Sequence, residues 1–379
     1  MDISNPKRKR IKRKAPIGNF DYGIFYTVLF LLAIGTVMVY SASSYYAMYE
    51  KKDSMYFLKK EILWVFVGLC CMFFMMGFDY HKLKKYTRML VLVCIPLLLI
   101  VFLFPGTNGA QRWIKLGPLS FQPSDLAKYT VVFFLAFKLE RKGEGIKQFK
   151  QGILRYLAFS GIFALLVLLE KNLSIASVIM IVTFIMLFAS GGRIKHLFGV
   201  VAPVLIIAAG ALAYSSEYRR DRLLNFLNPW KDPAGNGYQL IQSFYALGAG
   251  GVTGLGLGQS RQKTLYMPEP HNDFIFSIIG EELGLIGCLV IISLFIIFIW
   301  RGINVAIKAK DTYGTLLAIG ITSVIAVQAI INIAVVTGSM PVTGVPLPFI
   351  SYGGTSLVIN LTAMGVLLNI SRQIEGKEL

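Results

Sequence analysis

Residues 273–299 read DFIFSIIGEELGLIGCLVIISLFIIFI, a run in which only Asp273, Glu281 and Glu282 are charged. A helix that crosses the hydrocarbon core of a bilayer needs about 20 mostly apolar residues. The run meets that requirement and is too long for a buried strand. It therefore predicts a membrane-spanning helix that carries three acids in its first half.

Similar apolar runs recur along the whole chain. The 379 residues are 55% hydrophobic and only 15% charged, whereas about a quarter of the residues in soluble domains are charged. We therefore predict an all-α polytopic membrane protein. The sequence favours about ten transmembrane helices, at residues 23–43, 60–78, 89–105, 125–138, 156–169, 173–190, 197–215, 273–299, 315–336 and 353–371.

The distribution of Lys and Arg predicts the orientation of the chain. A basic tail, residues 1–22, contains the run KRKRIKRK from Lys7 to Lys14. Basic residues collect on the cytoplasmic side of membrane proteins and bind anionic lipid head groups. We therefore place both termini in the cytoplasm. The net charge of +18 then requires no nucleic acid as partner.

The predicted organisation is a cytoplasmic tail, a transmembrane domain at 23–371 and a second cytoplasmic tail at 372–379. A large extracellular loop, residues 216–272, joins the seventh and eighth helices. Its stretch 244–258 (FYALGAGGVTGLGLG) is apolar and rich in glycine, and we expect it to dip partway into the membrane, where only protein or a wet cavity can satisfy irregular backbone. Because neither a preceding strand nor a following GK[ST] is present, we predict no nucleotide site there.

Asp273 is the first candidate for chemistry. It ends the segment PEPHND, in which Glu269 and His271 also lie, at the outer mouth of the eighth predicted helix. A carboxylate held at a membrane–water boundary can act as a base or bind a metal. The alternative is that Asp273 only caps the helix.

Glu281 and Glu282 lie deeper in the same helix. Successive helical residues are about 100° apart, so Glu281 and not Glu282 is expected to share a cavity with Asp273. The alternative is a structural ion pair of Glu281 with Lys128 in the fourth predicted helix, because buried acids need partners.

Several Lys and Arg residues are predicted on the outer side, although basic residues usually collect on the cytoplasmic side. Their presence there suggests anion binding. Arginine presents a planar fork that suits phosphate oxygens. The alternative is solvated loop charge. The candidates are Arg112, Lys128, Arg261 and Lys263, together with Arg219, Arg220 and Arg222 at the start of the large loop.

Three long segments resemble the signatures of the shape, elongation, division and sporulation family, which includes FtsW, RodA and SpoVE. They are Gly109 to Lys128 (GAQRWIKLGPLSFQPSDLAK), Gly254 to Gly284 (GLGLGQSRQKTLYMPEPHNDFIFSIIGEELG) and Met340 to Ser356 (MPVTGVPLPFISYGGTS). The ending NLTAMGVLLNISR, Asn360 to Arg372, is more similar to the division and sporulation branch.

The resemblance implies a peptidoglycan glycosyltransferase, a hexosyltransferase that polymerises lipid II into glycan strands at the outer face of the bacterial cytoplasmic membrane. It implies a catalytic role for Asp273, with Glu281, His271 and Glu269 in supporting or orienting roles. Arg112, Lys128, Arg261 and Lys263 are expected to bind the pyrophosphate of lipid II. Further motif residues are Trp113, Gln122, Pro123, Ser124, Asp125, Ser351, Tyr352, Gly353 and Gly354.

The resemblance also implies a class B penicillin-binding protein as partner, with other division or sporulation proteins, at the division or sporulation septum. We expect a divalent cation, Mg²⁺ or Mn²⁺, to help meet the charge of the leaving group, and its ligands stay open. Two alternatives to the enzyme remain: a lipid II flippase whose head-group path is lined by Lys128, Glu281 and Glu282, and a membrane scaffold for a division transpeptidase.

The chain departs from the family pattern in three places. Asp125 stands where the family usually has Glu, and Thr343 stands where some members have Lys. In place of a PDLGT-like segment the chain has Glu170 to Ser174 (EKNLS). The role of the family's acid at that turn is therefore open here.

Overall fold

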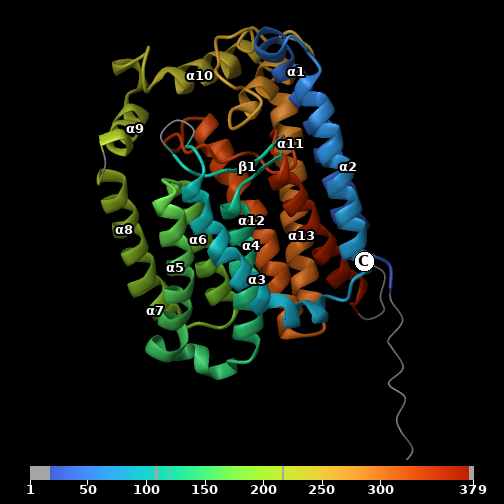
Figure 1. Cartoon of the computed structure of the whole chain (residues 1–379), viewed down its shortest axis with the longest axis vertical. Helices are drawn as coiled ribbons and strands as arrows, with labels where there is room; N and C mark the ends of the chain where they lie inside the picture. The colour runs from blue at the N-terminus through green and yellow to red at the C-terminus, as the bar shows by residue number, and fades with distance from the viewer. Residues whose placement is uncertain (1–17, 107–109, 118, 216, 375–379) are drawn as a thin grey trace, which may run out of the picture.

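The computed structural model describes residues 18–106, 110–117, 119–215 and 217–374, so most of the two predicted cytoplasmic tails lies outside the described residues. The chain is almost entirely helical (Figure 1). The α-helices are α1 (Tyr22–Lys51), α2 (Tyr56–Gly77), α3 (Tyr80–Ile100), α4 (Pro123–Glu140), α5 (Arg155–Leu169), α6 (Leu173–Ala189), α7 (Ile194–His196), α8 (Ala202–Tyr214), α9 (Glu217–Leu227), α10 (Tyr238–Gly250), α11 (Ile275–Lys308), α12 (Thr312–Val336) and α13 (Thr355–Arg372).

Short elements complete the chain. Two antiparallel strands form a small hairpin on the outer side, with Ile114 paired to Phe121. These are β1 (Ile114–Leu116) and β2 (Leu119–Phe121), and the remaining turns are η1 (Val101–Leu103), η2 (Gly143–Lys147), η3 (Phe149–Leu154), η4 (Leu197–Val201) and η5 (Pro229–Lys231).

The predicted all-α membrane architecture is confirmed. The ten apolar runs fall on α1 to α6, on α8 with the turns before it, and on α11 to α13. Within the described residues, seven helical segments are long and apolar enough to cross a membrane. Their ranges are Tyr22–Lys51, Tyr56–Gly77, Tyr80–Leu103, Phe149–Leu169, Ile194–Leu212, Ile275–Lys308 and Thr312–Val336.

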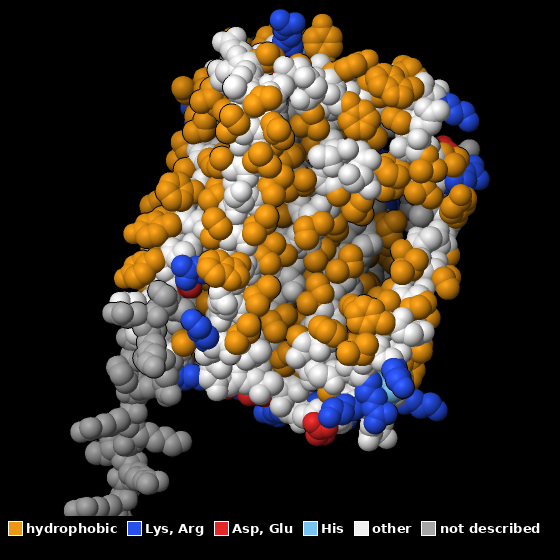
Figure 2. Space-filling model, turned by 180° about the vertical axis from the view of Figure 1, so that it is seen from behind, with side chains coloured by type: hydrophobic (Ala, Val, Ile, Leu, Met, Phe, Trp, Pro, Cys, Tyr) orange, Lys and Arg blue, Asp and Glu red, His pale blue; other side chains and the backbone are white. Residues whose placement is uncertain are grey.

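The helices form one bundle around α12. This helix packs against α4, α6 and α11, and α13 packs along α2. The main contacts of α8 are with its own neighbours η4 and α9, and Figure 1 shows it standing at the edge of the bundle. Apolar side chains cover the middle of the surface and Lys and Arg gather towards its ends (Figure 2). That distribution suits a bilayer, because charged groups are costly at membrane depth.

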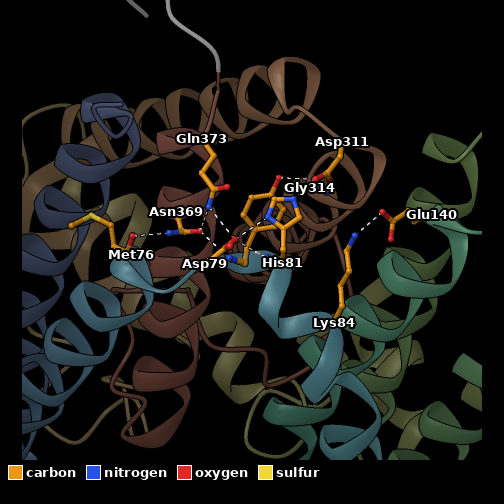
Figure 3. A network of polar contacts seen from close by, with 10 residues as sticks. Met76, Asp79, His81, Lys84, Glu140, Asp311, Gly314, Asn369 and Gln373 are labelled. Carbon is orange, nitrogen blue, oxygen red and sulfur yellow. Dashed lines mark hydrogen bonds and ion pairs between the residues drawn. The ribbon is translucent and has the colours of Figure 1, made fainter. Parts of the chain in front are cut away.

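Polar contacts at the end of the bundle that the sequence places in the cytoplasm join helices that are distant in sequence (Figure 3). His81 at the start of α3 contacts both Asp79, which caps α3, and Asp311, which caps α12. The side chain of Asn369 in α13 accepts a hydrogen bond from Tyr80 N–H at 3.0 Å and donates one to the Met76 carbonyl at 2.8 Å. These contacts fix the cytoplasmic ends of α2, α3, α12 and α13 relative to one another.

A break in α11 is the main irregularity within the bundle. Gly284 has φ 65° and ψ −165° inside the helix, about 14 Å from its start at 1.5 Å per residue. The glycine-rich end of the large loop lies against this break. The described residues show four backbone hydrogen bonds there, from the N–H groups of Leu255 and Gly256 to the carbonyls of Glu281 and Glu282, and from those of Leu285 and Ile286 to the carbonyls of Gly251 and Val252.

Only glycine permits this contact. A Cβ on Gly284 would lie 2.3 Å from the nitrogen of Gly254, and a Cβ on Gly254 would lie 2.2 Å from the carbonyl oxygen of Glu282. Both residues also have positive φ, a conformation that side chains disfavour. The glycine-rich stretch therefore lies beside the first third of α11. Its depth in a membrane stays a prediction.

We predict that Gly284→Ala lowers the free energy of unfolding by more than about 2 kcal/mol, from backbone strain and steric overlap together. The measurement is the thermal unfolding midpoint of the purified protein in detergent. Gly161→Ala in α5 is the control, because a Cβ there meets nothing within 4 Å and alanine favours a helix. Equal midpoints for the two variants would contradict the account of the break.

Candidate functional site

Asp273 lies in the short segment that leads into α11. The capping position of that helix is taken by Phe274, with no side-chain hydrogen bond, so the interpretation of Asp273 as a helix cap is wrong. Instead, Asn332 of α12 donates from its side-chain amide to the carbonyls of Asp273 and Val345, both at 2.7 Å. One buried amide thus fixes Asp273 against the last outer loop.

The carboxyl of Asp273 faces that loop. A Cβ built on Gly344 would be 3.5 Å from the carboxyl oxygen Oδ2, so a glycine at this position leaves space beside the acid. The neighbouring Val342 accepts a hydrogen bond at 3.3 Å through its carbonyl from Arg222 of α9. The large loop and the last loop therefore meet at Asp273.

The surroundings of Asp273 favour a base. Burial raises the pKa of its carboxyl and the charge of Glu269 adds to that effect, while Arg222 acts in the opposite direction. A carboxylate of raised pKa holds a proton more strongly and is a better base. Burial is the largest of these effects. The sequence grouped Arg222 with its neighbours and did not single it out.

A second polar group lies at the outer end of α4. Lys128 is only 2% exposed, and its ammonium pairs with Asp125 at 2.7 Å. The proposed pair of Lys128 with Glu281 is therefore wrong. Pro123 starts α4, and Gln122 before it donates a hydrogen bond to the buried Ser124.

Arg112 and the turn between α5 and α6 complete this group. The guanidinium of Arg112 donates to the carbonyls of Glu170, at 3.4 Å, and Lys171. In the same turn, the Ser174 hydroxyl donates to the carbonyl of Thr343 at 2.6 Å. Thr343 precedes Gly344, so the turn and Asp273 contact adjoining residues of the last outer loop. Trp113 beside Arg112 is half-buried.

Glu281 and Glu282 are held by the end of the large loop. The Glu281 carboxylate accepts hydrogen bonds from the Ser260 hydroxyl and from the backbone N–H of Arg261, whose own side chain is exposed. Glu281 was expected to share a cavity with Asp273, and its partners lie instead in this loop. The role left to it is to anchor the loop.

Lys263 has partners within the protein. It was expected to bind phosphate, but its ammonium is buried and donates to Glu282 at 2.8 Å and to Ser41 at 3.0 Å. The Ser41 hydroxyl also donates to the Glu282 carboxylate at 2.7 Å. These bonds tie the loop to α1 and α11, next to a cavity of about 720 Å³ lined by Ser41, Ser260 and Lys263.

His271 lies among the aromatic rings of Tyr46, Phe57 and Tyr352. Its ring is 2% exposed and lies 4.3 Å from the ring of Phe57 in α2, centroid to centroid. Burial lowers the pKa of His271 to about 4, so the ring is neutral at physiological pH. Its carbonyl accepts from the backbone N–H of Tyr352 at 3.0 Å. The histidine thus positions the segment before Asp273.

The remaining motif residues support these loops. Glu269 is exposed and accepts at 2.8 Å from the side chain of Asn272. The buried Ser351 accepts at 2.8 Å from Leu347 N–H, while Gly353 and Gly354 lead into α13. Within the described ranges, no group of three or more His, Cys, Asp or Glu side chains could hold a metal ion.

Comparisons with known proteins agree with this architecture. The family described as cell cycle protein, that of FtsW, RodA and SpoVE, matches residues 22–376. The stage V sporulation protein E of Bacillus subtilis is 45% identical over 91% of this chain and 94% of its own. A probable peptidoglycan glycosyltransferase FtsW of Geobacter sp. strain M18 is 41% identical over 95% and 99%.

Two solved structures are also similar. One, from a work titled "Structural coordination of polymerization and crosslinking by a peptidoglycan synthase complex", is 28% identical with a TM-score of 0.76, over 94% of this chain and 99% of that one. The rod shape determining protein RodA of Thermus thermophilus is 25% identical with a TM-score of 0.68, over 94% and 98%.

We predict that Lys263→Met lowers the free energy of unfolding by about 3–5 kcal/mol, because it leaves the Glu282 carboxylate buried without its cation. The double variant Lys263→Met, Glu282→Leu should regain most of that loss, since an apolar pair can replace a buried ion pair. Unfolding midpoints of the three proteins provide the measurement. If the single variant keeps wild-type stability and instead loses affinity for a pyrophosphate lipid, Lys263 binds phosphate after all.

Proposed function

The chain belongs to the cell cycle protein family of FtsW, RodA and SpoVE and is a peptidoglycan glycosyltransferase of the membrane, and we propose that it polymerises lipid II at the outer face with Asp273 as its base. The observation that carries the proposal is the setting of Asp273. Its carboxyl is half-buried at the mouth of α11, is held by Asn332 and has a raised pKa.

In the proposed reaction, Asp273 takes the proton of the acceptor sugar hydroxyl. The hydroxyl oxygen forms a bond to the anomeric carbon of the donor glycan, and the bond from that carbon to the pyrophosphate oxygen breaks. The leaving undecaprenyl pyrophosphate takes the electron pair. A single displacement of this kind inverts the anomeric centre. A base held close to the hydroxyl lowers the barrier because proton transfer needs no diffusive encounter.

Positive charge near the reacting groups stabilises the leaving pyrophosphate. Arg112 and Lys128 are the residues proposed from the sequence, and Arg222 joins them because it lies beside Asp273. Arg261 remains a candidate with an exposed side chain. Arginine can bind phosphate oxygens through two parallel N–H groups, which fixes the orientation of the phosphate.

A divalent cation was predicted beside these residues. The described residues do not fit a site in which the protein alone holds Mg²⁺ or Mn²⁺ through carboxylates, because no three His, Cys, Asp or Glu side chains among them converge. Asp125 is moreover already bonded to Lys128. We therefore assign no step of the reaction to a cation.

The transport alternative depends on buried charges that could line a path for the head group. In the structure these charges have protein partners. Lys128 pairs with Asp125, Glu282 with Lys263, and Glu281 with the loop at Ser260. Moving a head group along them would break each pair at a cost of several kcal/mol. This arrangement favours the enzyme.

The proposed partner is a class B penicillin-binding protein, which would cross-link the strands that this chain makes. The support is a similar solved structure whose title names a complex that couples polymerisation and crosslinking. Relatives named for sporulation and for FtsW support a place at the division or sporulation septum, with other proteins of that machinery and with membrane lipids.

We predict that Asp273→Asn lowers the rate of glycan-strand formation by about 10²–10⁴-fold, the usual contribution of a general base. The assay uses labelled lipid II in detergent, with each protein alone and with a cognate penicillin-binding protein that lacks glycosyltransferase activity. Asp53→Asn, a carboxylate at the outer ends of α1 and α2 that is 40% exposed, should retain the wild-type rate. Normal polymer from Asp273→Asn would refute the assignment.

We also predict the direction of the pH dependence. The base must be ionised, and burial raises the pKa of Asp273, so kcat/KM should fall as pH decreases through that raised pKa. The fall should begin at a higher pH than the pKa of about 3.9 of an ordinary aspartate would give. The measurement is initial polymerisation rate against pH for wild type. A rate that is constant down to the ordinary range of aspartate would contradict the proposed base.

A further inference from the structure

Glu170 is a buried acid that the proposed reaction does not use. It ends α5 at the turn into α6 and is 0% exposed. Neither of its carboxyl oxygens makes a hydrogen bond of good geometry to a described residue, although the Ser124 hydroxyl lies close enough to act on the acid. An ionised carboxylate in such a position is expensive, whereas a neutral one is tolerated. This position also falls in the segment where the chain departs from the PDLGT-like pattern.

The groups around Glu170 come from every neighbouring element. Arg112 beside the hairpin and Asp125 of α4 act on it electrostatically, and Asp125 itself is bonded to Lys128. Cys94 of α3 lies within reach of its charge. In its own turn, the side chain of Lys171 is exposed. The acid therefore lies among the residues proposed to bind pyrophosphate.

Burial raises the pKa of Glu170 to about 8. The Asp125 carboxylate adds to that effect, and Ser124 and Arg112 offset part of it. Below that pH the carboxyl is neutral, and above it a negative charge appears beside Arg112. The Arg112 guanidinium donates to two backbone carbonyls of the same turn, those of Glu170 and Lys171, which hold it near Glu170. The ionisation of Glu170 therefore changes the electrostatic field that Arg112 presents.

We propose that Glu170 is a positioning residue that leaves the positive charge of Arg112 to the pyrophosphate of the substrate only while its own carboxyl is neutral. The inference rests on the proposed function, because it assumes a pyrophosphate lipid at Arg112. An ionised Glu170 would neutralise Arg112 and repel the phosphate at short range in a poorly solvated site. By reciprocity, a bound pyrophosphate favours the protonated acid.

The turn that contains Glu170 also contacts the loop beside Asp273. Ser174 donates to the carbonyl of Thr343, and the next residue, Gly344, lies beside the Asp273 carboxyl. Productive binding then needs Glu170 protonated while the reaction needs Asp273 ionised. The two acids set opposite limits of the pH range in which the enzyme works.

The test is the affinity of the full chain in nanodiscs for undecaprenyl pyrophosphate, measured from about two pH units below to two above the pKa of Glu170. Wild-type affinity should fall by up to about tenfold for each pH unit above that pKa. Glu170→Gln should bind with the low-pH affinity of wild type at every pH, without the decrease above the pKa of Glu170. The ionisation of the ligand affects both proteins equally, so it cancels in the ratio of their affinities.

Two controls separate charge from structure. Glu144→Gln removes a carboxylate whose side chain is 85% exposed on the predicted cytoplasmic side, and it should behave as wild type. Glu170→Asp keeps a titrating carboxyl and should keep the alkaline fall. If Glu170→Gln does not fold, calorimetry on wild type in buffers of different ionisation enthalpy should still detect proton uptake on binding above the pKa of Glu170.

Several results would overturn the proposal. They are an unchanged alkaline fall in Glu170→Gln, a wild-type affinity without any fall, absence of binding at every pH, and binding above the pKa of Glu170 without proton uptake. Polymer formation is a separate readout. A wild-type protein that binds with the expected pH dependence and yet makes no polymer would refute the proposed function and leave the role of Glu170 standing.

Discussion

In the hydrocarbon core of a membrane no water is present to pair with backbone N–H and C=O groups, so every such group needs a partner within the protein. The break in α11 at Gly284 would leave several of these groups unpaired. The glycine-rich end of the large loop supplies the missing partners through Gly251, Val252, Leu255 and Gly256. This pairing fixes the part of the large loop that follows Gly256. That part contains Ser260 and Lys263, which bind Glu281 and Glu282. The position of the whole outer region depends on this backbone pairing.

The same requirement governs the buried charges. Lys128 with Asp125, and Lys263 with Glu282, each form an ion pair of 2.7–2.8 Å with little exposure. Such pairs give little net stability, but the loss of one partner is costly. The first pair fixes the start of α4 within that helix. The second joins the large loop to α11, and to α1 through Ser41. Asp273 and Glu170 differ from these acids, because no described cation is bonded to either carboxyl, and burial raises the pKa of both.

This contrast divides the acids of the chain into two kinds. The paired acids hold the architecture, while Asp273 and Glu170, whose pKa burial raises, hold a proton more strongly than an exposed acid does. A base benefits from a raised pKa, and an anion-binding site benefits from a neighbouring acid that stays neutral. Both needs are met by partial or full burial near the outer surface, at the places where the last outer loop contacts the start of α11 and the turn between α5 and α6.

The sequence by itself determined the class of the fold, because long apolar runs can be stable only as helices in a bilayer, and it identified Asp273, Lys128 and Arg112 as residues of interest at the outer face.

The sequence could not determine the partners of these residues. Lys128 pairs within its own helix with Asp125 three residues before it, although Glu281 was the expected partner. Lys263 turned out to be a joint, Arg222 lies beside Asp273, and the helix cap is Phe274. These outcomes depend on how loops pack against helices, which brings Lys263 to Ser41 of α1 and Asn332 of α12 to Asp273. Local periodicity contains no information about such contacts. Only the tertiary structure decides which charges are buried together, and burial is what sets the pKa of Asp273 and of Glu170.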